Sequence, residues 1–119
     1  MDLDNPVVKL CIEGTQAEFE GRPEDACALY WQAWNARKND YDSCIAAHYV
    51  ARCQKTAEDI FHWNQEALTR AIAIRDGSAE EFYPSLYLNM GQSYEMLGNE
   101  TEAARFYNLA ARLGYIHQV

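Results

Sequence analysis

The residues best suited to chemistry are Cys44 and His48, which lie four positions apart. On a helix this spacing places both side chains on one face, where Cys11 from a neighbouring helix could join them as a third zinc ligand. The spacing places no fourth ligand, and a packed thiol beside a histidine is the simpler interpretation. We therefore predict that the chain holds no metal.

Other candidate catalytic groups are explained by helix chemistry. The acidic pairs Glu58–Asp59 and Glu80–Glu81 fall in the first turns of expected helices, where carboxylates stabilise the helix dipole. Ser78 and Ser93 have no His–Asp partners at an interpretable spacing, and neither GxxxxGK nor GxGxxG occurs. We predict that the protein is not an enzyme and uses no cofactor.

Four cysteines, at positions 11, 27, 44 and 53, show neither CxxC spacing nor the dense packing of small secreted domains. They are most simply reduced, mostly buried thiols of a cytoplasmic protein, although the sequence leaves a disulfide framework open. The segment from Met1 to Pro6 is acidic where a signal peptide would be basic. No apolar run approaches the roughly 20 residues of a membrane-spanning helix.

The net charge of the chain argues against two classes of binding partner. The formal net charge is −8, and the ten Lys and Arg residues are scattered along the chain. No basic stripe exists that could neutralise phosphates, so we expect neither nucleic acid nor an anionic membrane surface as a partner. With 119 residues the chain has room for one domain, spanning 1–119.

Proline, glycine and capping residues predict six helices. Asn5, Thr56 with Asp59, Ser78 with Glu81, and Asn99 with Glu102 read as helix starts. Pro84 is expected either to kink the fifth helix or to mark its true start. The predicted helices span about 5–20, 23–38, 41–54, 57–76, 79–97 and 100–113. No strand pattern occurs, so the fold class is all-α, with short loops that force antiparallel neighbours.

An internal repeat links the two ends of the chain. Small residues, glycines and one tyrosine recur with the same gaps, 4, 3, 4, 5, 4 and 3, in two distant segments. A glycine within the first helix would let the second helix approach, the next glycine would form the turn, and the tyrosine would fill the groove. The two sets are Leu10, Gly14, Ala17, Gly21, Ala26, Tyr30, Ala33 and Tyr87, Gly91, Tyr94, Gly98, Ala103, Tyr107, Ala110.

This pattern resembles the tetratricopeptide repeat (TPR), with repeats at about 5–38, 41–76 and 79–113. The middle repeat is degenerate, because fourteen residues separate Val50 from Asn64 where nine separate Ala17 from Ala26. It is similar to the long-helix variants of kinesin light chains. The resemblance implies helix pairs stacked as a right-handed superhelical solenoid. It also implies a concave face, formed by the first helix of each pair, that binds a peptide or protein.

Carried onto this chain, the resemblance implies a non-catalytic adaptor or scaffold. The expected ligand is a peptide with an apolar anchor or a positive charge. The carboxylate clamp of chaperone-binding members is absent, since the corresponding helices offer Cys11, Thr15, His48, Ser85 and Asn89. The concave positions are Val8, Cys11, Thr15, Phe19, Tyr41, Cys44, His48, Arg52, Leu88, Gln92 and Glu95.

An alternative function uses the other end of the array. Arrays of this family often close with an extra polar helix, whereas only residues 115–119 follow the sixth helix here. Phe106, Leu109 and Leu113 are therefore expected to leave an apolar face partly bare. Such a face would support a structural homo-oligomer, most simply a two-fold dimer.

Overall fold

The computed structural model describes residues 1–114, and these residues form six α-helices and no strand. The prediction of an all-α chain is confirmed. Two short 3₁₀ helices, η1 (Ala51–Cys53) and η2 (Glu80–Phe82), complete the fold. The α-helices are α1 (Pro6–Phe19), α2 (Pro23–Asn35), α3 (Asp40–Val50), α4 (Ala57–Ala73), α5 (Tyr83–Met96) and α6 (Glu100–Arg112).

The helix ends follow local chemistry. The side chains of Asn5, Thr56 and Asn99 accept hydrogen bonds from backbone N–H groups in the first turns of α1, α4 and α6, as predicted. Gly21 and Gly98 have φ angles of +76° and +80°, a conformation that glycine adopts without steric cost. These two glycines form the turns of the first and last helix pairs.

At the fifth helix, the alternative that Pro84 marks the true start is confirmed, and the predicted cap at Ser78 is wrong. Ser78 does not cap it; instead the Ser78 backbone N–H donates to Asp76 Oδ1 at 2.9 Å in a turn. The helix begins at Tyr83, because Pro84 fits a first turn, where its missing N–H leaves no hydrogen bond unmade. The third helix also ends early, at Val50, and tightens into η1, while the fourth ends at Ala73.

The repeat governs packing as expected. A Cβ atom on Gly14 would lie 2.3 Å from Cε1 of Tyr30, and a Cβ on Gly91 would lie 2.5 Å from Cε1 of Tyr107. Both distances are far below a van der Waals contact, so only glycine lets each tyrosine ring lie flat on its partner helix. The predicted close approach in both pairs is confirmed.

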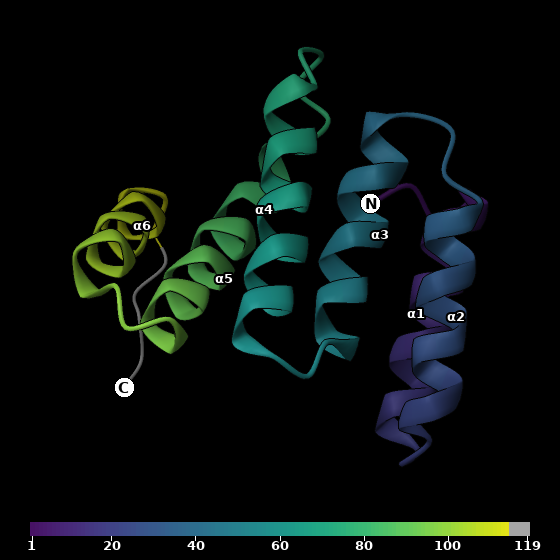
Figure 1. Ribbon diagram of the computed structural model, residues 1–119. Helices are drawn as coiled ribbons and strands as arrows, with labels where there is room; N and C mark the ends of the chain where they lie inside the picture. Colours follow the sequence, from purple (N-terminus) through teal and green to yellow (C-terminus); the bar gives the residue numbers. More distant parts are fainter. Residues whose placement is uncertain (115–119) are drawn as a thin grey trace.

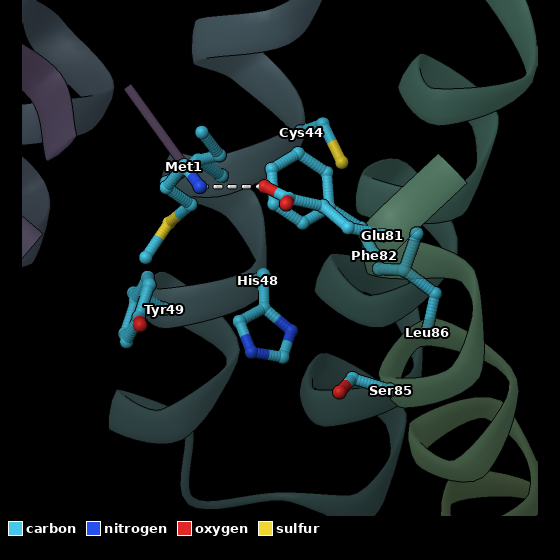
Figure 2. Close-up of a pocket in the computed structure, with 9 residues that line it drawn as sticks. Met1, Cys44, His48, Tyr49, Glu81, Phe82, Ser85 and Leu86 are labelled. Carbon is cyan, nitrogen blue, oxygen red and sulfur yellow. Dashed lines mark ion pairs between the residues drawn. The ribbon is translucent and has the colours of Figure 1, made fainter. Parts of the chain in front are cut away.

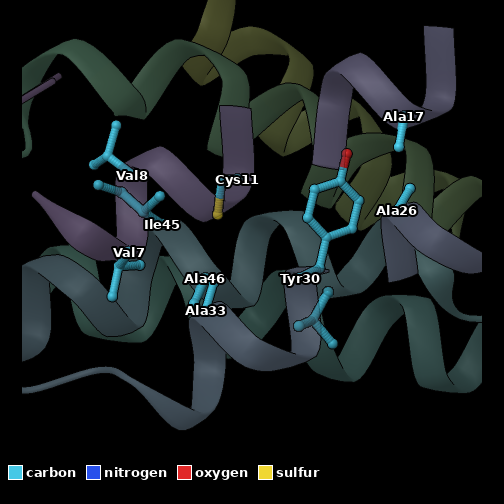
Figure 3. Close-up of a cluster of buried hydrophobic side chains, with 10 residues drawn as sticks. Val7, Val8, Cys11, Ala17, Ala26, Tyr30, Ala33, Ile45 and Ala46 are labelled. Carbon is cyan, nitrogen blue, oxygen red and sulfur yellow. The ribbon is translucent and has the colours of Figure 1, made fainter. Parts of the chain in front are cut away.

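Helices that are adjacent in sequence are adjacent in space (Figure 1). One core cluster joins α1, α2 and α3, with Val7, Val8 and Cys11 facing Ile45 and Ala46 (Figure 3). A second cluster joins α3, α4, α5 and α6 around Leu68, Leu86 and Met90. Within residues 1–114, every helix is too short or too polar to cross a membrane.

Candidate binding groove

An apolar pocket of about 330 Å³ lies between α3 and the start of α5 (Figure 2). Its wall is mostly hydrocarbon and aromatic, with three polar side chains at its margin. Such a surface suits one apolar side chain rather than a charged group. The lining residues are Met1, Cys44, Ile45, His48, Tyr49, Glu81, Phe82, Ser85 and Leu86.

The chain's own first residue occupies part of this pocket. The amino group of Met1 lies 2.7 Å from Oε1 of Glu81, an ion pair across the pocket mouth (Figure 2). The backbone N–H of Asp2 donates to the hydroxyl of Tyr41 on α3 at 3.0 Å and holds the segment there.

A second, more polar pocket of about 470 Å³ adjoins the first. His48 and Ser85 line both pockets, so the two lie side by side, and we call them together the α3–α5 groove. The polar pocket brings together four residues predicted for the concave face: His48, Arg52, Leu88 and Gln92. Its other lining residues are Ala51, Gln54, Ile60, Asn64, Ser85 and Asn89.

His48 is held as a neutral ring at the centre of the groove. Burial, and to a smaller extent the nearby positive charge of Arg52, lower the pKa of His48 to about 4. The Asn89 side-chain amide lies 3.2 Å from Nδ1 of the ring. With the amide nitrogen donating, Nδ1 accepts and Nε2 carries the proton. The groove therefore has no positive charge at this point near neutral pH.

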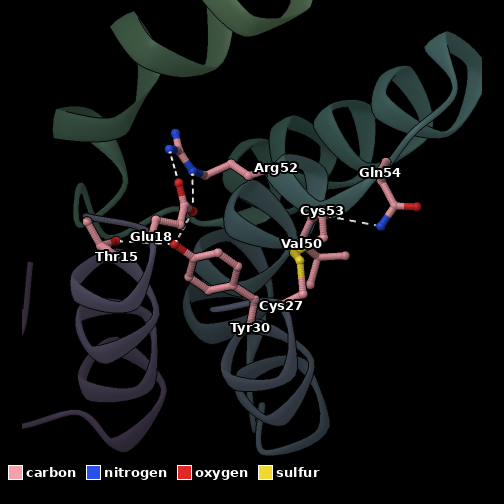
Figure 4. Close-up of a disulfide and its surroundings, with 8 residues drawn as sticks. All are labelled: Thr15, Glu18, Cys27, Tyr30, Val50, Arg52, Cys53 and Gln54. Carbon is pink, nitrogen blue, oxygen red and sulfur yellow. Dashed lines mark hydrogen bonds and ion pairs between the residues drawn. A yellow bond between two sulfur atoms is a disulfide. The ribbon is translucent and has the colours of Figure 1, made fainter. Parts of the chain in front are cut away.

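Arg52, the cation predicted for the groove, is bound by an acid. Its Nε and Nη2 atoms donate to the two carboxylate oxygens of Glu18 at 2.9 and 2.6 Å (Figure 4). The Arg52 hydrogen bond lowers the pKa of Glu18, and the Tyr30 hydroxyl also donates to this carboxylate. Burial, and then the adjacent Glu18, raise the pKa of Tyr30 to about 12. The bidentate pair joins α1 to η1 and cancels the charge of Arg52.

The structure corrects the prediction of four reduced thiols. Cys27 of α2 and Cys53 of η1 form a disulfide, with their Cα atoms 5.7 Å apart (Figure 4). Cys11 and Cys44 are free and buried, and burial raises the pKa of each thiol to about 12. The bonded pair is 26 residues apart in sequence, so no local spacing signals it.

Not every predicted concave residue faces the groove. Val8 and Cys11 are fully buried, so neither side chain can contact a ligand. Cys44 is 1% exposed and contributes only to the floor of the apolar pocket. Phe19 is 90% exposed but lines neither groove pocket, and neither do Thr15 and Glu95. Tyr41 lies beside the groove, where its hydroxyl binds Asp2.

Several groove residues had no sequence signal. Glu81 and Phe82 lie in η2, a segment that the sequence predicted as regular helix. Tyr49 and Leu86 look like ordinary core positions of a helical stripe. Irregular backbone and the lateral offset between α3 and α5 place these four side chains in the apolar pocket.

The expected bare face at α6 is smaller than predicted. Phe106 is 5% exposed, because its ring stacks on Tyr94 at a centroid distance of 5.7 Å. Leu109 is half-buried, whereas Leu113 is 50% exposed. Residues 115–119, whose shortness suggested the bare face, lie outside the described part of the chain. Within residues 1–114, no group of three or more His, Cys, Asp and Glu residues could hold a metal ion.

Comparisons with known proteins do not place the chain in a family. No family model matches it, and no curated protein or solved structure matches it either.

Proposed function

We propose that this protein is a TPR-like, non-catalytic adaptor that binds an extended segment of another protein in the α3–α5 groove. The observation that carries the proposal is the pair of adjoining pockets, one apolar and one polar, that share His48 and Ser85. Peptides are commonly bound in this way, with a pocket for one side chain beside polar groups for the main chain.

Support for a TPR-like arrangement comes from the two glycine–tyrosine contacts. Gly14 with Tyr30 and Gly91 with Tyr107 set the same helix-to-helix approach at both ends of the chain. α3 and α5, the first helices of the second and third pairs, supply about half of the residues that line the two pockets, as they would on the concave face of a superhelix.

The polar pocket has groups suited to a peptide backbone. Ser85 and Gln92 are exposed in it, and each side chain can both donate and accept a hydrogen bond. Leu88 and Ile60 also line this pocket and offer apolar contacts. Because Arg52 is neutralised by Glu18 and His48 is uncharged, this pocket favours neutral backbone over a carboxylate.

A displayed library of random peptides, selected on the intact chain, tests the proposal. Peptides from the selection should bind the wild type and lose at least about tenfold in affinity to Ser85→Trp, because an indole at a position that lines both pockets would obstruct a peptide that passes from one to the other. Gln65→Trp is the matched control, since Gln65 is exposed on α4 and lines neither pocket. Selected peptides that bind Ser85→Trp as tightly as they bind the wild type would contradict the proposal.

A homo-oligomer is the second candidate, favoured by exposed apolar side chains near the end of the array. Leu113, directly after α6, is 50% exposed, and Leu109 one turn earlier is half-buried. Sedimentation at high micromolar concentration tests it, because Leu113→Asp should dissociate any dimer built on this face. Phe106 does not belong in that test, since a charge at a buried position would unfold the helix pair.

The disulfide is relevant to the cellular compartment in which the protein is found. Disulfides persist in oxidising compartments and are rare in the reducing cytosol. The cytoplasmic location that the sequence suggested is therefore not part of the proposal. Thiol alkylation of the protein in its native extract, with and without prior reduction, measures the state of Cys27 and Cys53 directly.

A further inference from the structure

The disulfide adjoins the polar pocket of the α3–α5 groove. Cys53 is the last residue of η1 and lies between Arg52 and Gln54, which both line the polar pocket (Figure 4). Its partner Cys27 lies in α2 and lines neither groove pocket. One covalent bond therefore ties this wall of the pocket to the first helix pair.

A surface ion pair and a local hydrogen bond also hold the side chains beside Cys53. Arg52 pairs with Glu18, but its side chain is 52% exposed, so the pair contributes little. The Gln54 amide nitrogen donates to the backbone oxygen of Val50 at 3.1 Å, a bond within the same segment of the chain. η1 itself has only three residues and the weak hydrogen-bond geometry of a 3₁₀ helix. The disulfide is thus the strongest link between this wall and α2.

A reductant can reach this disulfide, whereas the other two cysteines are shielded from it. Cys27 and Cys53 are both half-buried. Cys11 and Cys44 are 0% and 1% exposed, so neither thiol can attack the disulfide or be oxidised in its place. The buried residues of the first core cluster include neither member of the disulfide. The contacts among α1, α2 and α3 therefore persist when the bond is broken.

We propose that the Cys27–Cys53 disulfide is a redox switch for the groove, in which the oxidised protein binds its peptide tightly and the reduced protein binds it more weakly. A dithiol is the reductant. One thiolate of the dithiol attacks a sulfur of the disulfide and breaks the S–S bond, and its second thiolate then displaces that cysteine from the mixed disulfide. The protein gains two electrons and two protons as two thiols, and the dithiol becomes a cyclic disulfide.

Reduction acts on the groove by loosening its polar wall. Once the bond is broken, the side chains of Arg52 and Gln54 gain freedom, and a peptide must order them again when it binds. The apolar pocket keeps its walls, because no residue of η1 lines it. The inference rests on the proposed function and adds how peptide binding at that site is regulated.

The peptide affinities of the oxidised and reduced protein test the switch. A peptide without cysteine is selected on the oxidised chain, chosen because it loses affinity for Ser85→Trp, and labelled with fluorescein. In fluorescence anisotropy its Kd should rise about fivefold when dithiothreitol reduces the wild type, the cost of ordering one or two side chains. Cys27→Ser/Cys53→Ser should bind like the reduced wild type, with or without dithiothreitol.

A second pair of variants tests whether the effect passes through the pocket wall. Gln54→Ala removes one of the two side chains that the disulfide supports, so the effect of reduction on Kd should shrink to about twofold. Gln65→Ala is the matched control and should keep the full effect, because Gln65 is exposed on α4 and lines neither pocket. A full effect in Gln54→Ala would overturn the link between η1 and the groove.

Hydrogen exchange shows whether the change is local, and it needs no peptide. Exchange of the Gln54 amide, which donates to the Ala51 oxygen, should speed up on reduction, while α5 and α6 keep their protection. Unchanged exchange at Gln54 would overturn the switch. Loss of protection in α5 and α6 would also overturn it, because the disulfide would then support the whole fold.

The binding outcomes distinguish the switch from the proposed function. Ser85-dependent peptides that bind the reduced protein as tightly as the oxidised protein, or more tightly, would overturn the switch, while the proposed groove function would stand. A selection on the oxidised chain that yields no Ser85-dependent peptide would remove the proposed function, and the switch with it.

Discussion

The first and last helix pairs share one internal contact but are joined to the middle of the molecule in different ways. Within each pair a tyrosine ring lies on a glycine, Tyr30 on Gly14 and Tyr107 on Gly91. Besides apolar and aromatic packing, the joint between α1–α2 and the α3–η1 segment carries the disulfide and the Arg52–Glu18 ion pair, both of which hold η1. The joint between α3–α4 and α5 adds neutral hydrogen bonds to its apolar and aromatic packing.

The second joint depends on two amide contacts. Asn64 of α4 donates to the hydroxyl of Ser93 on α5 at 2.8 Å, and both side chains are buried. Asn89 of α5 contacts His48 of α3. Buried neutral hydrogen bonds are insensitive to salt and to reductants, whereas an exposed ion pair is screened by salt and a disulfide is reducible. The comparison teaches that similar helix pairs can be attached by chemically independent means.

Removing the disulfide should have the largest effect, and it should fall on the first joint. Closing a loop of 26 residues stabilises a fold by about 3.5 kcal/mol in the chain-entropy estimate. The variant Cys27→Ser/Cys53→Ser should lose about this much in urea unfolding. Hydrogen exchange should rise in α2 and η1 and stay unchanged in α6.

Cys11→Ser/Cys44→Ser is a poor control, because it puts hydroxyls into the core. The better comparison is the stability of the wild type with and without dithiothreitol. The stability of the Cys27→Ser/Cys53→Ser variant should not change when the reductant is added. Equal loss of protection in α2 and α6 on reduction would mean that the two ends do not respond independently.

Acid should act mainly on the second joint, through His48. Its folded pKa of about 4 lies below the unfolded value of 6.5, so the unfolded chain takes up the proton first. The stability contributed by the neutral ring is complete above about pH 6.5 and is lost as the pH falls towards 4. The shift sets an upper limit of about 3 kcal/mol.

His48→Gln isolates the effect of His48 protonation on stability, because a glutamine can still accept a hydrogen bond from Asn89 and does not titrate. Unfolding measured at several pH values should show that the wild type loses more stability than the variant between pH 6.5 and 4. Parallel curves for the two proteins would show that His48 is protonated equally easily in the folded and unfolded chains.

Replacing Gly14 or Gly91 with alanine should destabilise the protein to different extents, because the tyrosines that contact the two glycines lie in different surroundings. Tyr30 is fully buried and packs on Tyr49, with ring centroids 5.2 Å apart, so its ring has little freedom to move. Tyr107 is half-buried, although its hydroxyl is shielded from solvent, so its ring is less tightly enclosed than that of Tyr30. Gly14→Ala should therefore cost about 2 kcal/mol by overpacking, while Gly91→Ala should cost under about 1 kcal/mol because alanine also favours helix.

The same glycines show how much the sequence could predict. Contacts within a helix pair repeat at fixed spacing, so Gly14, Gly91 and the turns at Gly21 and Gly98 were found from intervals alone. Joints between pairs do not repeat. Cys27 and Cys53 meet only because α2 and η1 lie side by side, and no interval in the sequence encodes that meeting.

Errors at single residues have similar physical causes. The Ser78 cap failed because Pro84 provides a better helix start five residues after the predicted one. Phe106 was expected to be partly bare because the repeat pattern does not show that Tyr94 covers it. The family resemblance placed Val8 and Cys11 on the concave face, yet in α1 both side chains pack in a core with Ile45 of α3. Periodicity identifies an apolar stripe but not the neighbour that covers it.

The smallest expected effect belongs to the Arg52–Glu18 pair, and it completes the contrast between the joints. The Arg52 side chain is 52% exposed, so solvent screening limits its contribution to about 0.5–1 kcal/mol despite the bidentate geometry. Arg52→Gln should lower stability by that amount at low salt. In about 1 M salt the difference from wild type should shrink, because charges are then screened within about 3 Å.

Arg22→Gln, in the turn between α1 and α2, is the matched control, since Arg22 is exposed and forms ion pairs with Glu20 and Asp25, which are close to it in sequence. It should leave stability unchanged. Because Arg52 also lowers the pKa of Glu18, the wild-type advantage should fade as the pH drops through that lowered pKa. An Arg52→Gln deficit that persists in high salt and in acid would indicate that Arg52 acts by packing on η1 and not by charge.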